Sequence, residues 1–348
     1  MTARRDAVPG QEPAWASLSD KKLLDLRFCD LKLSIADSAM QARIHQLLRE
    51  LRELGFKFKP AFWISTEWFT PDGVPGCAVP FYLIHPRLAE LELRQVGEVE
   101  GGTAEWCMRI LRHETGHAID NAFHLRRRKR RQSLFGSSKV PYPEFYEPRP
   151  YSRSYVLHIE PSYAQSHPDE DFAETFAVWM TPHSDWRQRY ASRPVFKKLA
   201  YMDELMNSLR GVPPINTRRK QVEPLRELTT TLREHYAERR ARFGAGRDRS
   251  YDRDLQKLFP RRVTDPSGPD SADRFIAKLD KRALAKVQRW TGERQYLIAN
   301  VLADTRARCR HLNLGVDPQA TDTLENFLLF LTAQTVKYVL KGRNREWL

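Results

Sequence analysis

The chain has 348 residues, enough for two domains with substantial cores, and carries 58 Lys and Arg against 44 Asp and Glu, a net charge of +14. No run approaches the ~20 apolar residues of a membrane span, and residues 1–20 lack the apolar core of a secretion signal, so we expect a cytoplasmic protein without membrane contact. Four scattered cysteines without a C-x-x-C pair argue against a disulfide framework.

The N-terminal part of the sequence predicts a tail followed by a short strand and a helix. Residues 1–17 have the composition of a disordered tail, and residues 22–35 are expected to end in a strand. Residues 39–56 predict an amphipathic helix. Its apolar side consists of Ile44, Leu47, Leu48 and Leu51.

Two extended runs follow, at residues 61–69 and 76–86. The stretch TPDGVPG joins them, and its prolines and glycines predict a hairpin connection. Pro80 predicts an edge or irregular strand, and an edge strand can line a peptide cleft by β-addition.

Residues 101–125 predict a helix that carries the sequence HETGH. Thr103 is the expected N-cap. His113 and His117 stand one turn apart on one side of this helix, and Glu114 projects from the neighbouring flank. This spacing suits two zinc ligands with a carboxylate beside the metal-bound water. The alternative is a buried helix face whose two histidines make ordinary hydrogen bonds.

The basic block RRRKRR, residues 126–131, has three interpretations. It can be a solvated helix end whose cations suit the C-terminal dipole. It can bind nucleic acid, although no nucleic-acid motif accompanies it. It can also steer an acidic protein or peptide toward a cleft.

Residues 160–182 predict a second helix, with Pro168 at its first position and Thr181-Pro182 at its end. A third metal ligand is required, and the two glutamates of this helix, Glu170 and Glu174, are the best source. A solvated acidic helix start is the competing interpretation. Alanines beside the glutamates, and Gly116 on the first helix, predict a close approach of the two helices. Between them, residues 141–155 form a Pro- and Tyr-rich loop that could wall a cleft.

Beyond residue 215 the sequence is dominated by helical patterns, which predict an all-α C-terminal domain over 216–348 without an evident catalytic motif. These patterns occupy residues 224–243, 272–290, 293–312 and 323–342.

The motifs HETGHAID and SYAQSHPDEDFAETF together resemble the bacterial putative zinc-binding metallopeptidase family, a gluzincin-type group, and more distantly the catalytic domain of anthrax lethal factor. The pattern there is H-E-x-x-H-x-x-D, then a tyrosine seven residues before a ligand glutamate, and a second acidic residue four further on. The resemblance covers roughly residues 18–210. It implies an α+β, zincin-like domain over 18–215, with a small mixed sheet and the HExxH helix.

The resemblance also implies a ligand set and a catalytic base. His113, His117 and Glu170 would hold one zinc ion per chain, leaving a fourth position for a water. Glu170 is favoured as the third ligand because its helix would hold it rigidly, with His158 and His167 as alternatives. Glu114 would accept the proton of that water and pass it to the leaving amine.

Three further residues receive roles from the same pattern. Tyr163 would donate a hydrogen bond to the developing oxyanion. Glu174 is expected to orient His113, and Asp120 a ligand histidine.

The sequence therefore predicts a zinc metallopeptidase that hydrolyses a peptide or amide bond in a protein or peptide. The substrate can be an acidic protein or peptide. The alternative is a non-catalytic zincin scaffold that binds nucleic acid or an acidic partner through its basic surface. Glu114 and Tyr163 favour catalysis, because neither is required just to hold zinc.

Overall fold

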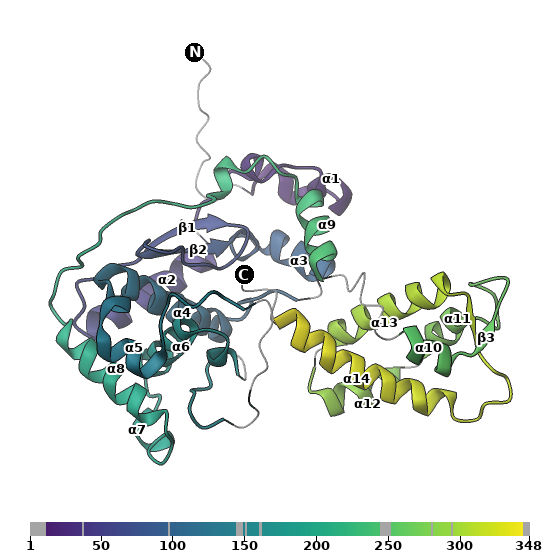
Figure 1. The fold of residues 1–348 in the computed structure, drawn as a ribbon. Helices are drawn as coiled ribbons and strands as arrows, with labels where there is room; N and C mark the ends of the chain where they lie inside the picture. Colours follow the sequence, from purple (N-terminus) through teal and green to yellow (C-terminus); the bar gives the residue numbers. More distant parts are fainter. Residues whose placement is uncertain are drawn as a thin grey trace. The chain divides into compact units, whose positions relative to one another are not determined.

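The computed structural model describes residues 12–36, 38–96, 98–143, 149, 152–159, 162–243, 252–279, 281–293 and 295–343. The chain divides into two compact units, the first ending at His235 and the second beginning at Tyr236. Helices dominate both units, and each contains a small two-stranded sheet (Figure 1). The mixed α+β class predicted from the sequence is confirmed.

The first unit begins with short helices rather than with a strand. A 3₁₀ helix, η1 (Ala14–Ser17), buries Trp15, whose indole N–H donates to the carbonyl of Leu31 at 3.0 Å. Of the tail expected over residues 1–17, residues 1–11 lie outside the described residues, whereas Ala14–Ser17 form η1. The strand expected within residues 22–35 is wrong, because α1 (Asp20–Leu24) and η2 (Phe28–Leu31) occupy this stretch.

The predicted amphipathic helix is present as α2 (Ala39–Glu53). Three of its four predicted apolar residues are buried: Ile44, Leu47 and Leu51. Glu50, also buried on this helix, forms two hydrogen bonds of 2.9 and 2.8 Å with Arg112, and this ion pair fastens α2 to the helix that carries HETGH.

The predicted hairpin is wrong. Strands β1 (Ala61–Ser65) and β2 (Gly76–Pro80) pair in parallel, so the connection between them must cross back along the sheet. Phe69, within that connection, forms an antiparallel bridge with Ala78 on β2. Asn121 holds the rest of the connection, because its side chain bonds to the backbone of residues 71, 73 and 74.

Helices α3 (Pro86–Val96) and α4 (Ala104–Phe123) follow the sheet. The Thr103 side chain accepts a hydrogen bond from the Trp106 N–H at 3.2 Å, which confirms the predicted N-cap. After α4 the chain turns through η4 (Leu125–Arg127) into α5 (Lys129–Phe135).

The second predicted helix is α6 (Pro168–Met180), which begins at Pro168 as expected and is preceded by η5 (Tyr163–Gln165). It packs directly against α4 in the interior of the first unit (Figure 1). Further helices of this part are α7 (Trp186–Arg189), α8 (Phe196–Ser208) and η6 (Leu225–Glu227), and α9 (Leu232–Phe243) spans the boundary between the units.

The segment after α8 makes its hydrogen bonds with the first unit. Trp63 and Ser65 of β1 donate side-chain hydrogen bonds to the carbonyls of Val222 and Glu223, and the Asn216 side chain donates to the carbonyl of Gly73. The helix expected over 224–243 is shorter than predicted, because α9 begins at Leu232. The proposed domain boundary after residue 215 stays a prediction about independent folding.

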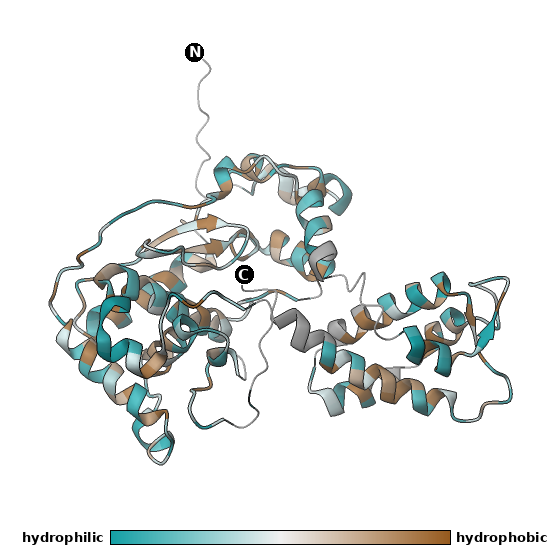
Figure 2. Cartoon of the chain, viewed as in Figure 1, coloured by the Kyte–Doolittle hydropathy of each residue, from teal (hydrophilic) through white to brown (hydrophobic). Residues whose placement is uncertain are grey.

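The second unit is helical around one apolar core. Its elements are α10 (Asp252–Leu258), β3 (Arg261–Arg262), α11 (Ala272–Ala277), α12 (Lys281–Thr291), α13 (Gln295–His311), β4 (Leu314–Gly315) and α14 (Thr323–Arg343). The short antiparallel β3–β4 pair corrects the all-α expectation, and residues 272–290 form two helices instead of one. Both α13 and α14 carry apolar and polar residues along their length (Figure 2). No helix among the described residues is both long and apolar enough to cross a membrane.

Candidate metal centre

Two histidines of α4 and one glutamate of α6 converge on one point inside the first unit. The Nε2 atoms of His113 and His117 lie 3.1 Å apart. Glu170 Oε2 lies 3.1 Å from the first of these nitrogens and 3.3 Å from the second. All three side chains are buried, and within the described part of the chain they form the group of His, Cys, Asp and Glu that could hold a metal ion.

The separations of these three atoms fit a tetrahedral zinc ion. Bonds of about 2.0–2.1 Å place two ligand atoms of a tetrahedron about 3.3–3.4 Å apart. The observed separations of 3.1, 3.1 and 3.3 Å are close to that value. Two imidazoles and one carboxylate are also a donor set of catalytic zinc sites, in which the fourth position stays open.

The close contact of α4 with α6 brings the glutamate to the histidines. A Cβ atom added to Gly116 would lie 2.8 Å from the Cα of Ala173 and 3.1 Å from its carbonyl oxygen. Only glycine therefore allows the two backbones to approach this far. The close approach predicted from the small residues on both helices is confirmed.

Glu174 lies behind His113, on the side away from the cluster. Its Oε1 is 2.8 Å from His113 Nδ1, and its Oε2 accepts a hydrogen bond from the Ile159 N–H at 3.1 Å. With Nδ1–H directed at Glu174, the neutral ring presents the Nε2 lone pair to the cluster. This is the geometry that the predicted orienting role of Glu174 requires.

The electrostatics of the cluster suit a cation. Burial alone would lower the pKa of His113, but hydrogen bonds with Glu170 and Glu174 outweigh burial and raise it to about 10. Burial opposes the ionisation of Glu170 as well, yet the two histidines hold the pKa of its carboxyl well below the usual range. The metal-free cluster therefore retains a proton, whose place a metal ion would take.

Glu114 lies beside the cluster but is not one of its three converging groups. Its carboxylate is buried, and Thr70 Oγ1 donates a hydrogen bond of 2.7 Å to Oε2. Thr70 belongs to the connection between β1 and β2, so the crossover that replaces the predicted hairpin also fixes this carboxylate.

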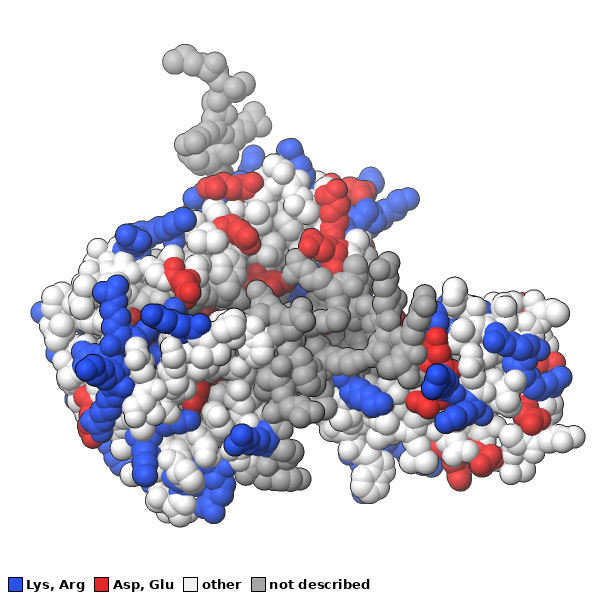
Figure 3. Space-filling model, in the orientation of Figure 1, with Lys and Arg blue, Asp and Glu red and all other residues white. Residues whose placement is uncertain are grey.

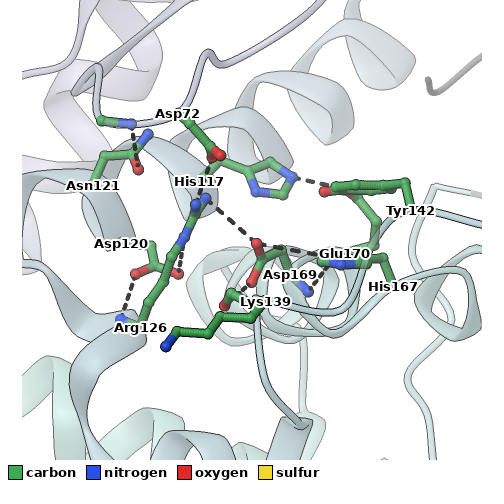
Figure 4. Close-up of polar contacts among 12 residues, drawn as sticks. Asp72, His117, Asp120, Asn121, Arg126, Lys139, Tyr142, His167, Asp169 and Glu170 are labelled. Carbon is green, nitrogen blue, oxygen red and sulfur yellow. Dashed lines mark hydrogen bonds and ion pairs between the residues drawn. The ribbon is translucent and has the colours of Figure 1, made fainter.

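Two tyrosines contact the cluster. Tyr163, in η5, is buried with its ring centroid 5.5 Å from that of His113. Burial raises the pKa of the Tyr163 phenol well above its ordinary value, and the charge of Glu170 and a hydrogen bond with it add to the effect. Tyr142 donates a hydrogen bond of 2.7 Å to Glu170 Oε1 (Figure 4).

Asp120 belongs to a cluster of ion pairs, and its expected role toward a ligand histidine stays a prediction. Its Oδ2 accepts a hydrogen bond of 2.7 Å from Arg131, and its Oδ1 accepts one of 2.9 Å from the Arg126 N–H. Arg131 also donates to Asp169 at 2.7 Å, and Arg126 reaches Asp72 (Figure 4). This cluster joins the end of α4 to α5 and to the start of α6.

The basic block is therefore divided between two environments, which none of the three sequence interpretations anticipated. Arg131 is fully buried, and Arg126 is partly buried. The exposed residues are Arg127, Arg128, Lys129 and Arg130. Lys and Arg side chains are frequent on the face formed by α5, α7 and α8 (Figure 3). Arg127 and Arg128 precede α5, whereas Lys129 and Arg130 are its first two residues, so the predicted benefit of a helix C-terminal dipole applies only to the end of α4.

The two alternative third ligands have other partners. His158 Nε2 lies 3.0 Å from the carbonyl of Arg109. His167 caps α6, because its Nδ1 accepts a hydrogen bond from the Asp169 N–H at 3.1 Å. Neither histidine belongs to the converging group.

Sequence reasoning missed Thr70 and Tyr142. Thr70 carries no local signal, since its position depends on a crossover that a Pro- and Gly-rich stretch does not specify. Tyr142 lies in the Pro- and Tyr-rich loop that was expected to wall a cleft, so composition indicated the segment but not the residue.

Comparison with known proteins supports the same assignment for part of the chain. Residues 108–203 match a family described as "Putative zinc-binding metallo-peptidase", and this segment includes most of α4, all of α6 and all three clustered residues. The resemblance found in the sequence is thus confirmed for that segment. Comparisons with curated proteins and with solved structures found no match.

Proposed function

We propose that the first unit is a zincin-type peptidase of the gluzincin kind, which hydrolyses a peptide or amide bond in a protein or peptide. The observation that carries this proposal is the convergence of His113, His117 and Glu170 at separations that fit one zinc ion. When bound, zinc supplies Lewis acidity that makes water a nucleophile at neutral pH.

The protein's own residues provide the proton transfers. Glu114 is the general base, which takes a proton from the attacking water and delivers it to the leaving amine. Thr70 donates its hydrogen bond to Oε2 of Glu114 and not to Oε1. This bond fixes the carboxylate beside the histidines. Glu174 holds His113 in the orientation that directs Nε2 at the ion.

Tyr163 is the proposed donor to the oxyanion that forms during attack. Its ring packs against His113, and its hydroxyl interacts with Glu170, so the phenol lies within the ligand cluster. Replacement of that interaction by a bond to the oxyanion would stabilise the transition state.

The test is the Glu114→Gln variant, compared with wild type and with Glu105→Gln. Glu105 is an exposed residue in the first turn of the same helix, so it controls for the loss of one carboxylate. We expect about one zinc per chain in all three proteins. Wild type and Glu105→Gln should cleave a proteome-derived peptide library, and Glu114→Gln should not. Absence of zinc from the wild type, even after zinc is added, would refute the proposal.

A non-catalytic role is the second candidate, favoured by the exposed cations Arg127, Arg128 and Lys129. In that case the basic surface would bind an acidic partner or nucleic acid. Nucleic-acid binding would weaken steeply with salt. Absence of library cleavage by both wild type and Glu114→Gln, combined with salt-sensitive binding, would favour this candidate.

A further inference from the structure

We propose that Tyr142 is a positioning residue of the metal centre, which holds Glu170 so that a single carboxylate oxygen faces the two histidines. This role rests on the proposed zinc-binding function. It adds a residue that lies outside the HETGH helix and outside α6, on the segment that follows α5.

The histidine contacts and the Tyr142 contact of the Glu170 carboxylate lie on different oxygens, and the Tyr163 hydroxyl also hydrogen-bonds to this carboxylate. Oε2 lies 3.1 and 3.3 Å from the Nε2 atoms of His113 and His117. Oε1 accepts the Tyr142 hydroxyl at 2.7 Å. A carboxylate whose second oxygen is engaged in this way is directed to bind a metal through one oxygen, and the remaining coordination position stays available to water or substrate.

The ring of Tyr142 is itself held in place. It stacks on the His167 ring, with a centroid separation of 3.8 Å and an interplanar angle of 15° (Figure 4). Since His167 Nδ1 accepts from Asp169, its Nε2 carries the proton and donates to the carbonyl of Val140 at 2.8 Å.

A second attachment fixes the same segment from its other end. Arg131 donates to Ser138 Oγ at 2.9 Å, and Ser138 in turn donates to Asp169. Residues 138–142 are thus fastened across the N-terminus of α6 at Ser138, Val140 and Tyr142. The position of the hydroxyl is consequently set by the protein before any metal binds.

Tyr142 differs from Tyr163 in its exposure, and this separates their roles. Tyr163 is 4% exposed and packs against His113, whereas Tyr142 is 39% exposed. Tyr142 therefore approaches Glu170 from the solvent side. A residue in that position can control both the binding mode of the carboxylate and its contact with water.

The test compares Tyr142→Phe with wild type and with a matched control, Tyr155→Phe. Phenylalanine keeps the ring that stacks on His167 and removes only the hydroxyl. Tyr155 is a half-buried tyrosine whose ring faces Lys198, a contact that phenylalanine preserves. Zinc affinity is measured by competition with a chromophoric chelator, and the cobalt-substituted proteins are compared by visible absorption.

We expect Tyr142→Phe to bind zinc about 10–100-fold more weakly than wild type. Its cobalt bands should weaken, because a carboxylate that binds through both oxygens raises the coordination number above four. Tyr155→Phe should match wild type in both measurements. These readouts do not depend on catalytic activity.

Two outcomes would overturn the inference, and they can be told apart. If wild type binds zinc tightly and Tyr142→Phe has the same affinity and the same cobalt spectrum, the hydroxyl only stabilises the segment. In that case the melting temperature of the metal-free protein would fall without any change at the metal. If wild type binds neither zinc nor cobalt, the proposed function fails and the role of Tyr142 fails with it.

Discussion

Replacement of Arg131 by methionine tests whether the basic block is a structural element. Arg131 is 0% exposed and donates to the buried carboxylates of Asp120 and Asp169, each at 2.7 Å. Methionine is also long and flexible, and can keep the contact with the Phe172 ring that the guanidinium now covers. The substitution therefore removes the charge while it retains much of the packing.

The expected cost follows from the two carboxylates that remain. Removal of one partner from a buried ion pair typically costs about 3–5 kcal/mol, because the other charge stays buried without compensation. Here Arg126 lies 3.5 Å from both Asp120 and Asp169 and compensates part of the loss. We therefore expect a decrease of about 3 kcal/mol in the free energy of unfolding.

The measurement is urea denaturation of the metal-free protein, followed by circular dichroism and extrapolated linearly to water. The matched control is Arg127→Met, which removes an exposed cation from the same block and should change stability by less than about 0.5 kcal/mol. Equal stability of Arg131→Met and Arg127→Met would show that the buried ion pairs contribute little and would refute this reasoning.

Three further predictions concern other parts of the first unit and the cysteines. Gly116→Ala should destabilise the protein by about 1–3 kcal/mol and weaken zinc binding, since its Cβ would lie 2.8 Å from the Cα of Ala173; unchanged zinc affinity would contradict this. Tyr163→Phe should lower kcat on the order of 10²–10³-fold with little change in KM, whereas a purely packing role would lower the melting temperature and leave kcat intact. A thiol reagent should fail to label three cysteines until the protein is denatured, because burial raises the pKa of each thiol and removes access to it; labelling of the native protein at any of them would be inconsistent with the fold. The three cysteines are Cys77, Cys107 and Cys309. The thiol pKa of Cys77 lies well above its ordinary value, that of Cys107 is raised to about 11, and that of Cys309 is raised to about 12.

Local signals were sufficient for the two helices of the candidate site. Thr103 identified the start of α4, and Pro168 identified the start of α6, because capping and the fixed φ of proline act within a few residues. The spacing of His113 and His117 then determined which side chains share a face. Glycine and alanine positions predicted the close helix contact, since steric size is also a property of single residues.

Features that depend on contacts between distant residues could not be predicted from local sequence signals. A Pro- and Gly-rich stretch indicates that the chain turns, but Asn121 on α4 holds the crossover that makes β1 and β2 parallel. Arg131 looked like one more surface cation, because its partners Asp120 and Asp169 come from two other helices. The sequence provides the charges, whereas the pairing that buries them arises only when α4, α5 and α6 pack together.

Two neighbouring glutamates of α6 have different expected roles at the metal centre. Glu170 and Glu174 stand one turn apart on α6, and both contact His113, but at opposite nitrogens of its ring. Glu170 also lies 3.3 Å from His117 Nε2, so its removal takes one ligand from the cluster. Removal of Glu174 leaves all three ligands and releases only the orientation of His113, a change that typically costs about 10–100-fold in metal affinity. We therefore expect Glu170→Ala to weaken zinc binding well beyond the loss in Glu174→Ala, when both are titrated against a chelator of known affinity. The reverse order would mean that Glu174 is the ligand, and a larger loss in His158→Ala or His167→Ala would move the third ligand away from α6 altogether.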